Sequence, residues 1–208
     1  MSGSFVSPEL RSRIRGLAEP VGRALARLGL SPNALTVIGF LIACAAAVAA
    51  GAQAWLLAGF LIIFGGIFDM FDGLVARATG QASKAGAFLD STFDRWGEGV
   101  VYIGLVAGCL LADFDLGAVL AAAAMSAAFM VSYTRARAES LGFAPGKGMA
   151  NVGLAPREVR LVILTVGVAL AGVSLTILAV SLGLIAVLAT ITTIQRIVVT
   201  LGQASRQG

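Results

Sequence analysis

Long apolar stretches follow one another along most of the chain and are separated by short polar or glycine-containing breaks. An α-helix needs about 20 mainly apolar residues to cross the hydrocarbon core of a bilayer. Six stretches of about this length lie near residues 34–51, 55–76, 86–112, 115–136, 158–178 and 180–201. This pattern predicts an all-α, polytopic membrane protein with six transmembrane helices. We expect a single domain over residues 1–208, with the six-helix bundle over residues 33–203.

The first 30 residues have a different periodicity. Ser7 can cap a helix that has Pro8 in its first turn. Apolar residues then recur at steps of three and four, at Leu10, Ile14, Leu17, Val21, Leu25 and Leu28. Arginines interrupt the segment throughout, so it lacks the continuous apolar core of a signal peptide. We therefore expect an amphipathic helix over residues 7–30 that lies in the membrane interface and precedes the bundle.

Three of the breaks are short and carry no basic residue: "AGAQAW", "LADFDL" and "LAGVSL". Short connections predict that the first and second, third and fourth, and fifth and sixth stretches pack as antiparallel neighbours. Within the third stretch, Gly104 and Gly108 are four residues apart. Small residues at this spacing allow close contact between helices in lipid.

The basic residues all fall on the other side of the predicted bundle. They are Arg11, Arg13, Arg15, Arg23, Arg27, Arg77, Lys84, Arg95, Arg135, Arg137, Lys147, Arg157, Arg160, Arg196 and Arg206. Lys and Arg are retained in short cytoplasmic loops of membrane proteins. Both termini and the polar ends of the helices are therefore expected on the cytoplasmic side. With no targeting segment recognised, the plasma membrane is the expected location.

Composition supports the membrane assignment and excludes some chemistry. Apolar residues make up 58% of the 208 residues and charged residues only 12%, whereas soluble domains have about 25% charged residues. The sequence contains no histidine, which excludes histidine catalysis and histidine-ligated zinc. Cys44 and Cys109 both lie in apolar stretches and are expected to fill the core. The net charge of +4, concentrated on one side, points to lipid headgroups or phosphorylated substrates and not to nucleic acid.

Four aspartates interrupt the second and third apolar stretches. Asp69 and Asp72 are three residues apart and Asp90 and Asp94 are four apart, so each pair shares one face of its helix. Charges in a membrane are costly, and such a cluster needs a cation. Mg²⁺ and Mn²⁺ prefer all-oxygen ligand sets, and two such ions favour displacement at phosphorus. We therefore expect a site for Mg²⁺ or Mn²⁺, with two ions.

Small and basic residues accompany the aspartates. Gly73 and Ala76 leave room for a ligand beside the helix backbone, and Arg77 offers a forked donor to a phosphate. Acids near the end of a membrane helix are commonly solvated or ion-paired, and glycine and alanine are commonly packing residues. Their concentration in one 26-residue stretch favours a phosphoryl-transfer site.

The stretch "DMFDGLVARATGQASKAGAFLDSTFD" matches the pattern DxxDGxxARx8Gx3Dx3D at every defined position. By this motif the chain resembles the CDP-alcohol phosphotransferases (CDP-alcohol phosphatidyltransferases). The resemblance implies a six-helix membrane enzyme, commonly a homodimer, that transfers a group from a CDP-linked donor to an alcohol and releases CMP. It further implies that Asp69, Asp72, Asp90 and Asp94 bind metal and that Asp94 is the general base.

The resemblance also implies a site for the CDP donor. Its residues would be Asn33, Thr36, Asp69, Gly73, Ala76, Arg77, Ser83 and Gly86. Asn33 and Thr36 belong to "SPNALT", which is similar to the segment that precedes the first span in this family.

A second basic cluster bears on the acceptor. Arg135, Arg137, Arg157, Arg160 and Arg196 are predicted to meet around one cytoplasmic cavity. Arg196 lies in an apolar run, where a guanidinium is costly unless it faces a ligand or partner, although it could extend to the membrane surface. Several arginines suit an acceptor that carries a phosphate. Headgroup binding is the alternative role for the arginines in the loops.

The same segments resemble phosphatidylinositol phosphate synthases, through "SYTRARAE", the Gly153, Arg157 and Arg160 spacing and the "QR" of the last stretch. This implies transfer of a phosphatidyl group from CDP-diacylglycerol, or a diether analogue, to inositol 1-phosphate, with phosphatidylinositol phosphate and CMP as products. Such enzymes usually have Arg-Pro-Glu-Arg where this chain has Val159 before Arg160.

Four alternatives stay open from the sequence. Glycerol 3-phosphate, as used by phosphatidylglycerophosphate synthases, is a second candidate acceptor. A soluble CDP-inositol donor, a non-catalytic binder of CDP-lipid and a divalent-cation transporter are the others. A transporter would not need Gly73, Ala76 and Arg77 or the second arginine cluster.

Overall fold

The computed structural model describes residue 24 and residues 29–78, 80–143 and 152–205, without the side chains of residues 70, 72, 77 and 78. The described residues form six α-helices: α2 (Pro32–Gly51), α3 (Trp55–Ala78), α4 (Lys84–Leu111), α5 (Asp115–Ser140), α6 (Arg157–Ala169) and α7 (Leu175–Ala204). The chain is therefore all-helical over these residues, as predicted. The amphipathic helix expected over residues 7–30 lies almost wholly outside the described residues.

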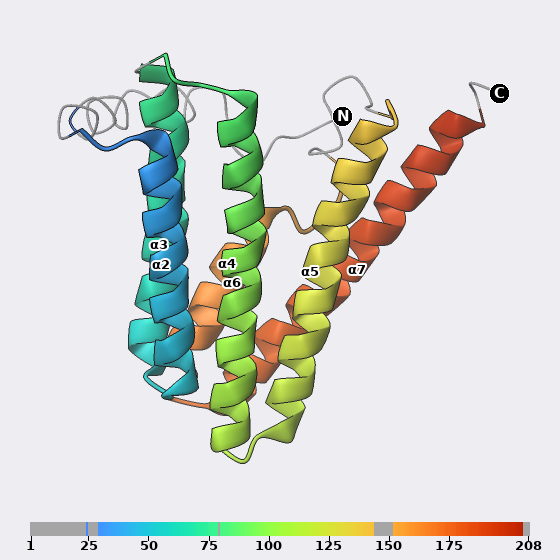
Figure 1. The fold of residues 1–208 in the computed structure, drawn as a ribbon. Coiled ribbons are helices and arrows are strands. Elements are labelled where there is room, and N and C mark those ends of the chain that lie inside the picture. Colours follow the sequence, from blue (N-terminus) through green and yellow to red (C-terminus); the bar gives the residue numbers. More distant parts are fainter. Residues whose placement is uncertain (1–23, 25–28, 79, 144–151, 206–208) are drawn as a thin grey trace, which may run out of the picture.

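The six described helices pack as a closed ring (Figure 1). Going round the ring, α2 contacts α3, α3 contacts α6, α6 contacts α7, α7 contacts α5, α5 contacts α4, and α4 contacts α2. The helices joined by short turns, α2 and α3, α4 and α5, and α6 and α7, are contacting pairs. The predicted antiparallel neighbours are thereby confirmed.

Polar caps and glycine contacts fix how the helices begin and approach each other. Ser31 and Ser83 cap α2 and α4, because each side chain accepts a hydrogen bond from a backbone N–H in the first turn.

A methyl group on Gly104 would lie 2.2 Å from the carbonyl oxygen of Ala47, and one on Gly108 would lie 2.1 Å from that of Ala50. Only glycine permits these contacts between α4 and α2, so the predicted close packing at these positions is confirmed.

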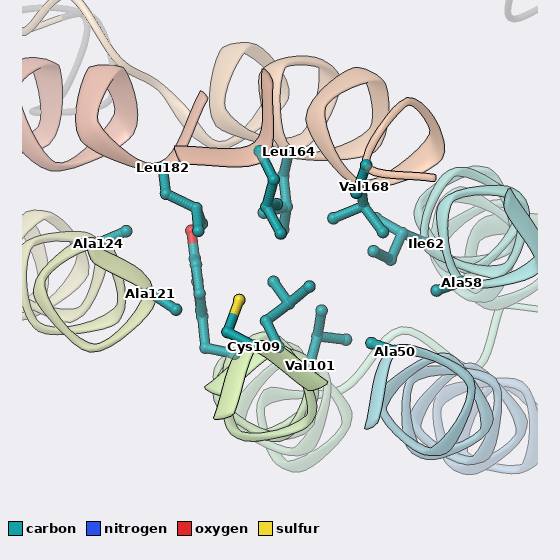
Figure 2. Close-up of a cluster of buried hydrophobic side chains, with 14 of the residues drawn as sticks. Ala50, Ala58, Ile62, Val101, Cys109, Ala121, Ala124, Leu164, Val168 and Leu182 are labelled. Carbon is teal, nitrogen blue, oxygen red and sulfur yellow. The ribbon is translucent and has the colours of Figure 1, made fainter. Parts of the chain in front are cut away.

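The inside of the ring is filled by small and medium apolar side chains. Figure 2 shows Leu164 and Val168 of α6 facing Val101 and Cys109 of α4 across the core. Cys109 is fully buried there, and both cysteines are free. The outer surface of the helices is also apolar: Leu56, for example, is 74% exposed. An apolar exterior around an apolar core is typical of a protein surrounded by lipid.

Among the described residues, four helices are long and apolar enough to cross a membrane: α2, α3 over Trp55–Ala76, α5 and α7. The bounds predicted for the last two apolar stretches were wrong. The predicted helix over residues 158–178 stops at Ala169, and α7 already begins at Leu175. The predicted break "LAGVSL", residues 170–175, does coincide with the turn between the two helices. The hydroxyl of Ser174 accepts the N–H of Thr176 there and caps α7.

Candidate active site

Three carboxylates converge at the end of the bundle where α2 and α4 begin and α3, α5 and α7 end, the upper end in Figure 1. Asp69 comes from α3, and Asp90 and Asp94 come from the first turns of α4. Carboxylate oxygens of these three residues lie within 4.8 Å of one another. The four-residue spacing of Asp90 and Asp94 puts both on the face of α4 that carries the site. Asp72 lies one turn after Asp69, and its side chain is outside the described part.

Arg157, the first residue of α6, offsets part of this negative charge. Its Nη1 atom lies 2.6 Å from Oδ2 of Asp69 and also donates to Oδ2 of Asp94. The site therefore already accommodates a cation between two of the carboxylates. The atoms of the cluster that could bind a metal ion are all carboxylate oxygens, which is the ligand type that Mg²⁺ and Mn²⁺ prefer. The residues present thus fit a divalent metal ion.

Six of the residues predicted to bind the CDP donor line one cavity at this end of the bundle. They are Asn33, Thr36, Gly73, Ala76, Ser83 and Gly86. Asp90 lines the same cavity and connects it to the carboxylate cluster. Asp69, predicted in the same set, lines a neighbouring cavity instead. The side chain of Arg77 lies outside the described residues.

Gly86 leaves one wall of this cavity, the predicted donor cavity, without a side chain. A methyl group there would lie 3.2 Å from Oγ of Ser83 and 3.6 Å from Oδ1 of Asn33. Ser83 itself is fixed, because its hydroxyl accepts the N–H of Gly86 at 3.0 Å. The hydroxyl of Ser83, at the start of α4, and the side-chain amide of Asn33, at the start of α2, therefore both lie beside Gly86 in the cavity wall.

A second cavity gathers four of the five arginines predicted to bind the acceptor phosphate. These are Arg135, Arg157, Arg160 and Arg196. Asp94 lines the same cavity, so one carboxylate of the cluster faces the arginines. Arg137 is not among its lining residues. Residues two apart on a helix point in nearly opposite directions, so Arg137 points away when Arg135 lines the cavity.

A third, mainly apolar cavity lies beside the other two and shares lining residues with both. It shares Thr36 with the donor cavity, and it shares Asp94, Arg157 and Arg160 with the arginine cavity. Four glycines, Gly39, Gly65, Gly66 and Gly97, help to line it. The carboxylates thus stand where three cavities meet.

Glu98 is a site residue that the sequence reasoning missed. Its carboxylate accepts hydrogen bonds from Nη1 of Arg95 at 2.5 Å and from Nη2 of Arg160 at 3.1 Å. Arg160 is only 2% exposed, and a buried guanidinium is costly without such a partner. The signal was available, because Glu98 follows Asp94 by the same four-residue step that separates Asp90 from Asp94.

Arg196 lies at the arginine cavity, but two of its donors are already used. Its Nε donates to the carbonyl of Val152 at 3.0 Å, and its Nη1 donates to the carbonyl of Val131. Arg196 therefore joins α7 to α5 and to the segment before α6. This bonding explains how a 4% exposed arginine is tolerated in an apolar helix.

Comparison with known proteins agrees with this arrangement. Residues 29–202 match the sequence model of the CDP-alcohol phosphatidyltransferases. The archaetidylinositol phosphate synthase of Pyrococcus horikoshii is 37% identical over 158 residues, which are 76% of this chain and 79% of that protein. The phosphatidylinositol phosphate synthase of Mycobacterium tuberculosis is 33% identical over 159 residues, 76% of this chain and 71% of that protein.

Solved structures of a phosphatidylinositol phosphate synthase from Mycobacterium tuberculosis have the same fold. One, with CDP-DAG bound, is 29% identical and superposes with a TM-score of 0.79 over 88% of this chain and 92% of that chain. Another, in complex with manganese and citrate, is 30% identical and has a TM-score of 0.79 over 88% of each chain. The sequence match covers most of the chain and includes every described residue of the carboxylate cluster. The chain belongs to the CDP-alcohol phosphatidyltransferase family of enzymes.

Proposed function

We propose that this enzyme transfers a phosphatidyl group from CDP-diacylglycerol, or the equivalent group of a diether analogue, to inositol 1-phosphate. The products are phosphatidylinositol phosphate and CMP. One observation carries the proposal: Asp94 lines the cavity that holds four of the predicted acceptor arginines, together with Arg95, while Asp90 of the same cluster lines the cavity beside Gly86. Relatives named as archaetidylinositol phosphate and phosphatidylinositol phosphate synthases support this choice of product.

The residues around Gly73 and Gly86 bind the nucleotide end of the donor, with Asn33, Thr36 and Ser83 as polar partners. Asp69, Asp72, Asp90 and Asp94 hold Mg²⁺ or Mn²⁺, with two ions. When bound, these ions neutralise the CDP diphosphate and make CMP a better leaving group. The relative in complex with manganese supports a divalent ion in this role.

Asp94 acts as the general base. It removes the proton from the attacking hydroxyl of the acceptor as the new oxygen–phosphorus bond forms and the bond to the CMP oxygen breaks. Its position in the carboxylate cluster and in the lining of the arginine cavity supports this role. Arg135, Arg157, Arg160 and Arg196 supply the positive charge for the acceptor phosphate, whereas Arg137 points away from this cavity.

The proposed setting is the plasma membrane. We propose that the six described helices belong to one domain together with the predicted interfacial segment over residues 7–30, with the site and both termini on the cytoplasmic side. The bias of basic residues toward the site end supports this orientation: the opposite turns, 52–54, 112–114 and 170–174, contain no Lys or Arg. We further propose a homodimer, as is common in the family that the motif indicates.

The test is CMP release by detergent-purified enzyme with Mg²⁺ and CDP-diacylglycerol or its diether analogue. Inositol 1-phosphate, free inositol, glycerol 3-phosphate and serine are compared as acceptors. Selective turnover with inositol 1-phosphate is expected. Selective turnover with glycerol 3-phosphate would retain the aspartate chemistry and overturn the acceptor. Release of CMP from soluble CDP-inositol would overturn the lipid donor.

A further inference from the structure

Two side chains of α7 fasten the segment before α6: Arg196 bonds to the carbonyl of Val152, and the hydroxyl of Thr192 holds two residues that lie nearer to α6. Oγ1 of Thr192 accepts hydrogen bonds from the backbone N–H groups of Leu154 and Ala155, both at 3.0 Å. The same hydroxyl donates to the carbonyl of Leu188 at 2.8 Å. Thr192 is fully buried, and all the bonding capacity of its hydroxyl is used.

Gly153 completes the fastening by shape. Its φ is +122°, and a methyl group at this position would lie 2.1 Å from Cγ2 of Thr192. Only glycine fits both the backbone conformation and the contact. This gives a physical reason for the spacing of Gly153, Arg157 and Arg160. The glycine lets the backbone contact α7 closely, four residues before the first of the two arginines.

The fastening leads directly to the site. Ala155, whose N–H is held by Thr192, accepts a hydrogen bond through its carbonyl from Nη1 of Arg160 at 3.0 Å. Arg157 follows two residues after Ala155 and contacts Asp69 and Asp94. The position of both arginines therefore depends on where α7 holds the start of α6.

We propose that Thr192 is a positioning residue for the acceptor: its hydroxyl sets the start of α6 so that Arg157 and Arg160 face the acceptor phosphate. This inference rests on the proposed function, because it takes the arginine cavity as the acceptor site. Thr192 does not line that cavity. Its effect is therefore exerted through the backbone and not by contact with substrate.

The experiment compares four enzymes: wild type, Thr192→Val, Thr192→Ser and Thr190→Val. Valine keeps the shape of threonine and leaves the two N–H groups without an acceptor, which is costly at the buried Ala155. We expect the KM for the acceptor to rise about tenfold or more, while the KM for the CDP-lipid and the affinity for CDP stay within about twofold. Serine restores the hydroxyl and should restore the acceptor KM.

Thr190→Val is the matched control. Thr190 is exposed on the same helix, and its hydroxyl bonds only within α7, to the carbonyl of Ala186. It should leave both KM values unchanged. If Thr192→Val does not yield folded enzyme, Thr192→Ala also removes the hydroxyl but relaxes the contact with Gly153, and the same split is expected.

An unchanged acceptor KM in Thr192→Val, equal losses for donor and acceptor, or failure of serine to restore the acceptor KM would each overturn the inference. These outcomes are separate from failure of the proposed function. That failure appears in the wild-type enzyme, as turnover with an acceptor other than inositol 1-phosphate, and the variants are then compared with that acceptor.

Discussion

The guanidinium of Arg157 lies 2.6 Å from the carboxylate of Asp69 and thereby joins the first residue of α6 to α3. The same guanidinium donates to Asp94. Arg157 thus binds one carboxylate oxygen of Asp69 and one of Asp94, and both oxygens are expected to bind metal. We therefore expect a divalent ion and Arg157 to compete for the same carboxylates.

Arg157→Gln should increase the affinity of the enzyme for Mn²⁺ by a few fold, because the neutral side chain no longer offsets the carboxylate charge. Thermal unfolding in detergent at increasing Mn²⁺ concentration measures this, since an ion that binds the folded state raises Tm. Arg135→Gln is the control: Arg135 pairs with Glu139 and makes no ion pair with the described carboxylates of Asp69, Asp90 and Asp94. Equal or weaker Mn²⁺ affinity in Arg157→Gln would contradict the competition.

Asp94→Asn should abolish measurable turnover while CDP-lipid binding is largely retained, because the amide cannot accept the proton of the acceptor hydroxyl. A loss of about 10² to 10⁴ in kcat is expected for a general base. CMP release gives the rate, and titration with CDP gives the binding. Asp115→Asn, at the opposite end of the bundle, is the control. Weak donor binding together with residual turnover would instead assign Asp94 to metal binding alone.

Glu98→Gln should lower the stability of the enzyme. Glu98 is the shared acceptor of Arg95 and of the buried Arg160, and removal of one partner from a buried ion pair costs about 3 kcal/mol. The matched variant is Glu139→Gln, because the pair of Glu139 and Arg135 is exposed and should contribute less than about 1 kcal/mol. Denaturant unfolding in detergent measures both. Similar stability losses in the two variants would rule out a special role for Glu98.

Gly86→Ala should weaken CDP binding and raise the donor KM, with little change in the acceptor KM. The added methyl group would stand 3.2 Å from Oγ of Ser83 at the wall of the donor cavity. Gly202→Ala is the control, because a methyl group there meets no atom within 4 Å. Isothermal titration with CDP measures the effect. Unchanged CDP affinity in Gly86→Ala would place the nucleotide elsewhere.

Arg196→Gln should raise the acceptor KM far more than the donor KM. The substitution removes a charge from the arginine cavity and the bonds to the carbonyls of Val131 and Val152. Steady-state kinetics with each substrate varied in turn measures the difference. Arg206→Gln, ten residues further along the chain, is the control variant. An acceptor KM equal to that of wild type would remove Arg196 from the acceptor site.

Local patterns in the sequence were sufficient for several of these features. The three-residue step from Asp69 to Asp72 and the four-residue step from Asp90 to Asp94 predicted that each pair shares one face of its helix. The described carboxylates, those of Asp69, Asp90 and Asp94, converge as expected. The same holds for Gly104 and Gly108, because helical periodicity alone brings them to one face. Apolar length identified where the helices lie, since lipid-facing and core-facing positions are both apolar.

Contacts between distant segments were beyond such reasoning. Arg157 is 63 residues from Asp94 in the chain, and no local pattern indicates that α6 packs against α3. The bonds of Arg196 to two backbone carbonyls depend on the same packing. The break "LAGVSL" was predicted where the turn after Ala169 lies, but the apolar stretch of residues 158–178 was extended through it, because apolar length alone does not show where a helix ends.

The shortness of α6 affects where the proposed reaction takes place. Its 13 residues span about 20 Å, whereas the hydrocarbon core of a bilayer is about 30 Å thick. Figure 1 shows the chain entering α6 well below the upper ends of α4 and α5. Arg157, the first residue of α6, therefore lies inside the bundle and not at its rim. A ligand that binds Arg157 is expected to enter between the helices, through the cavity that α4, α5 and α7 line together with the start of α6.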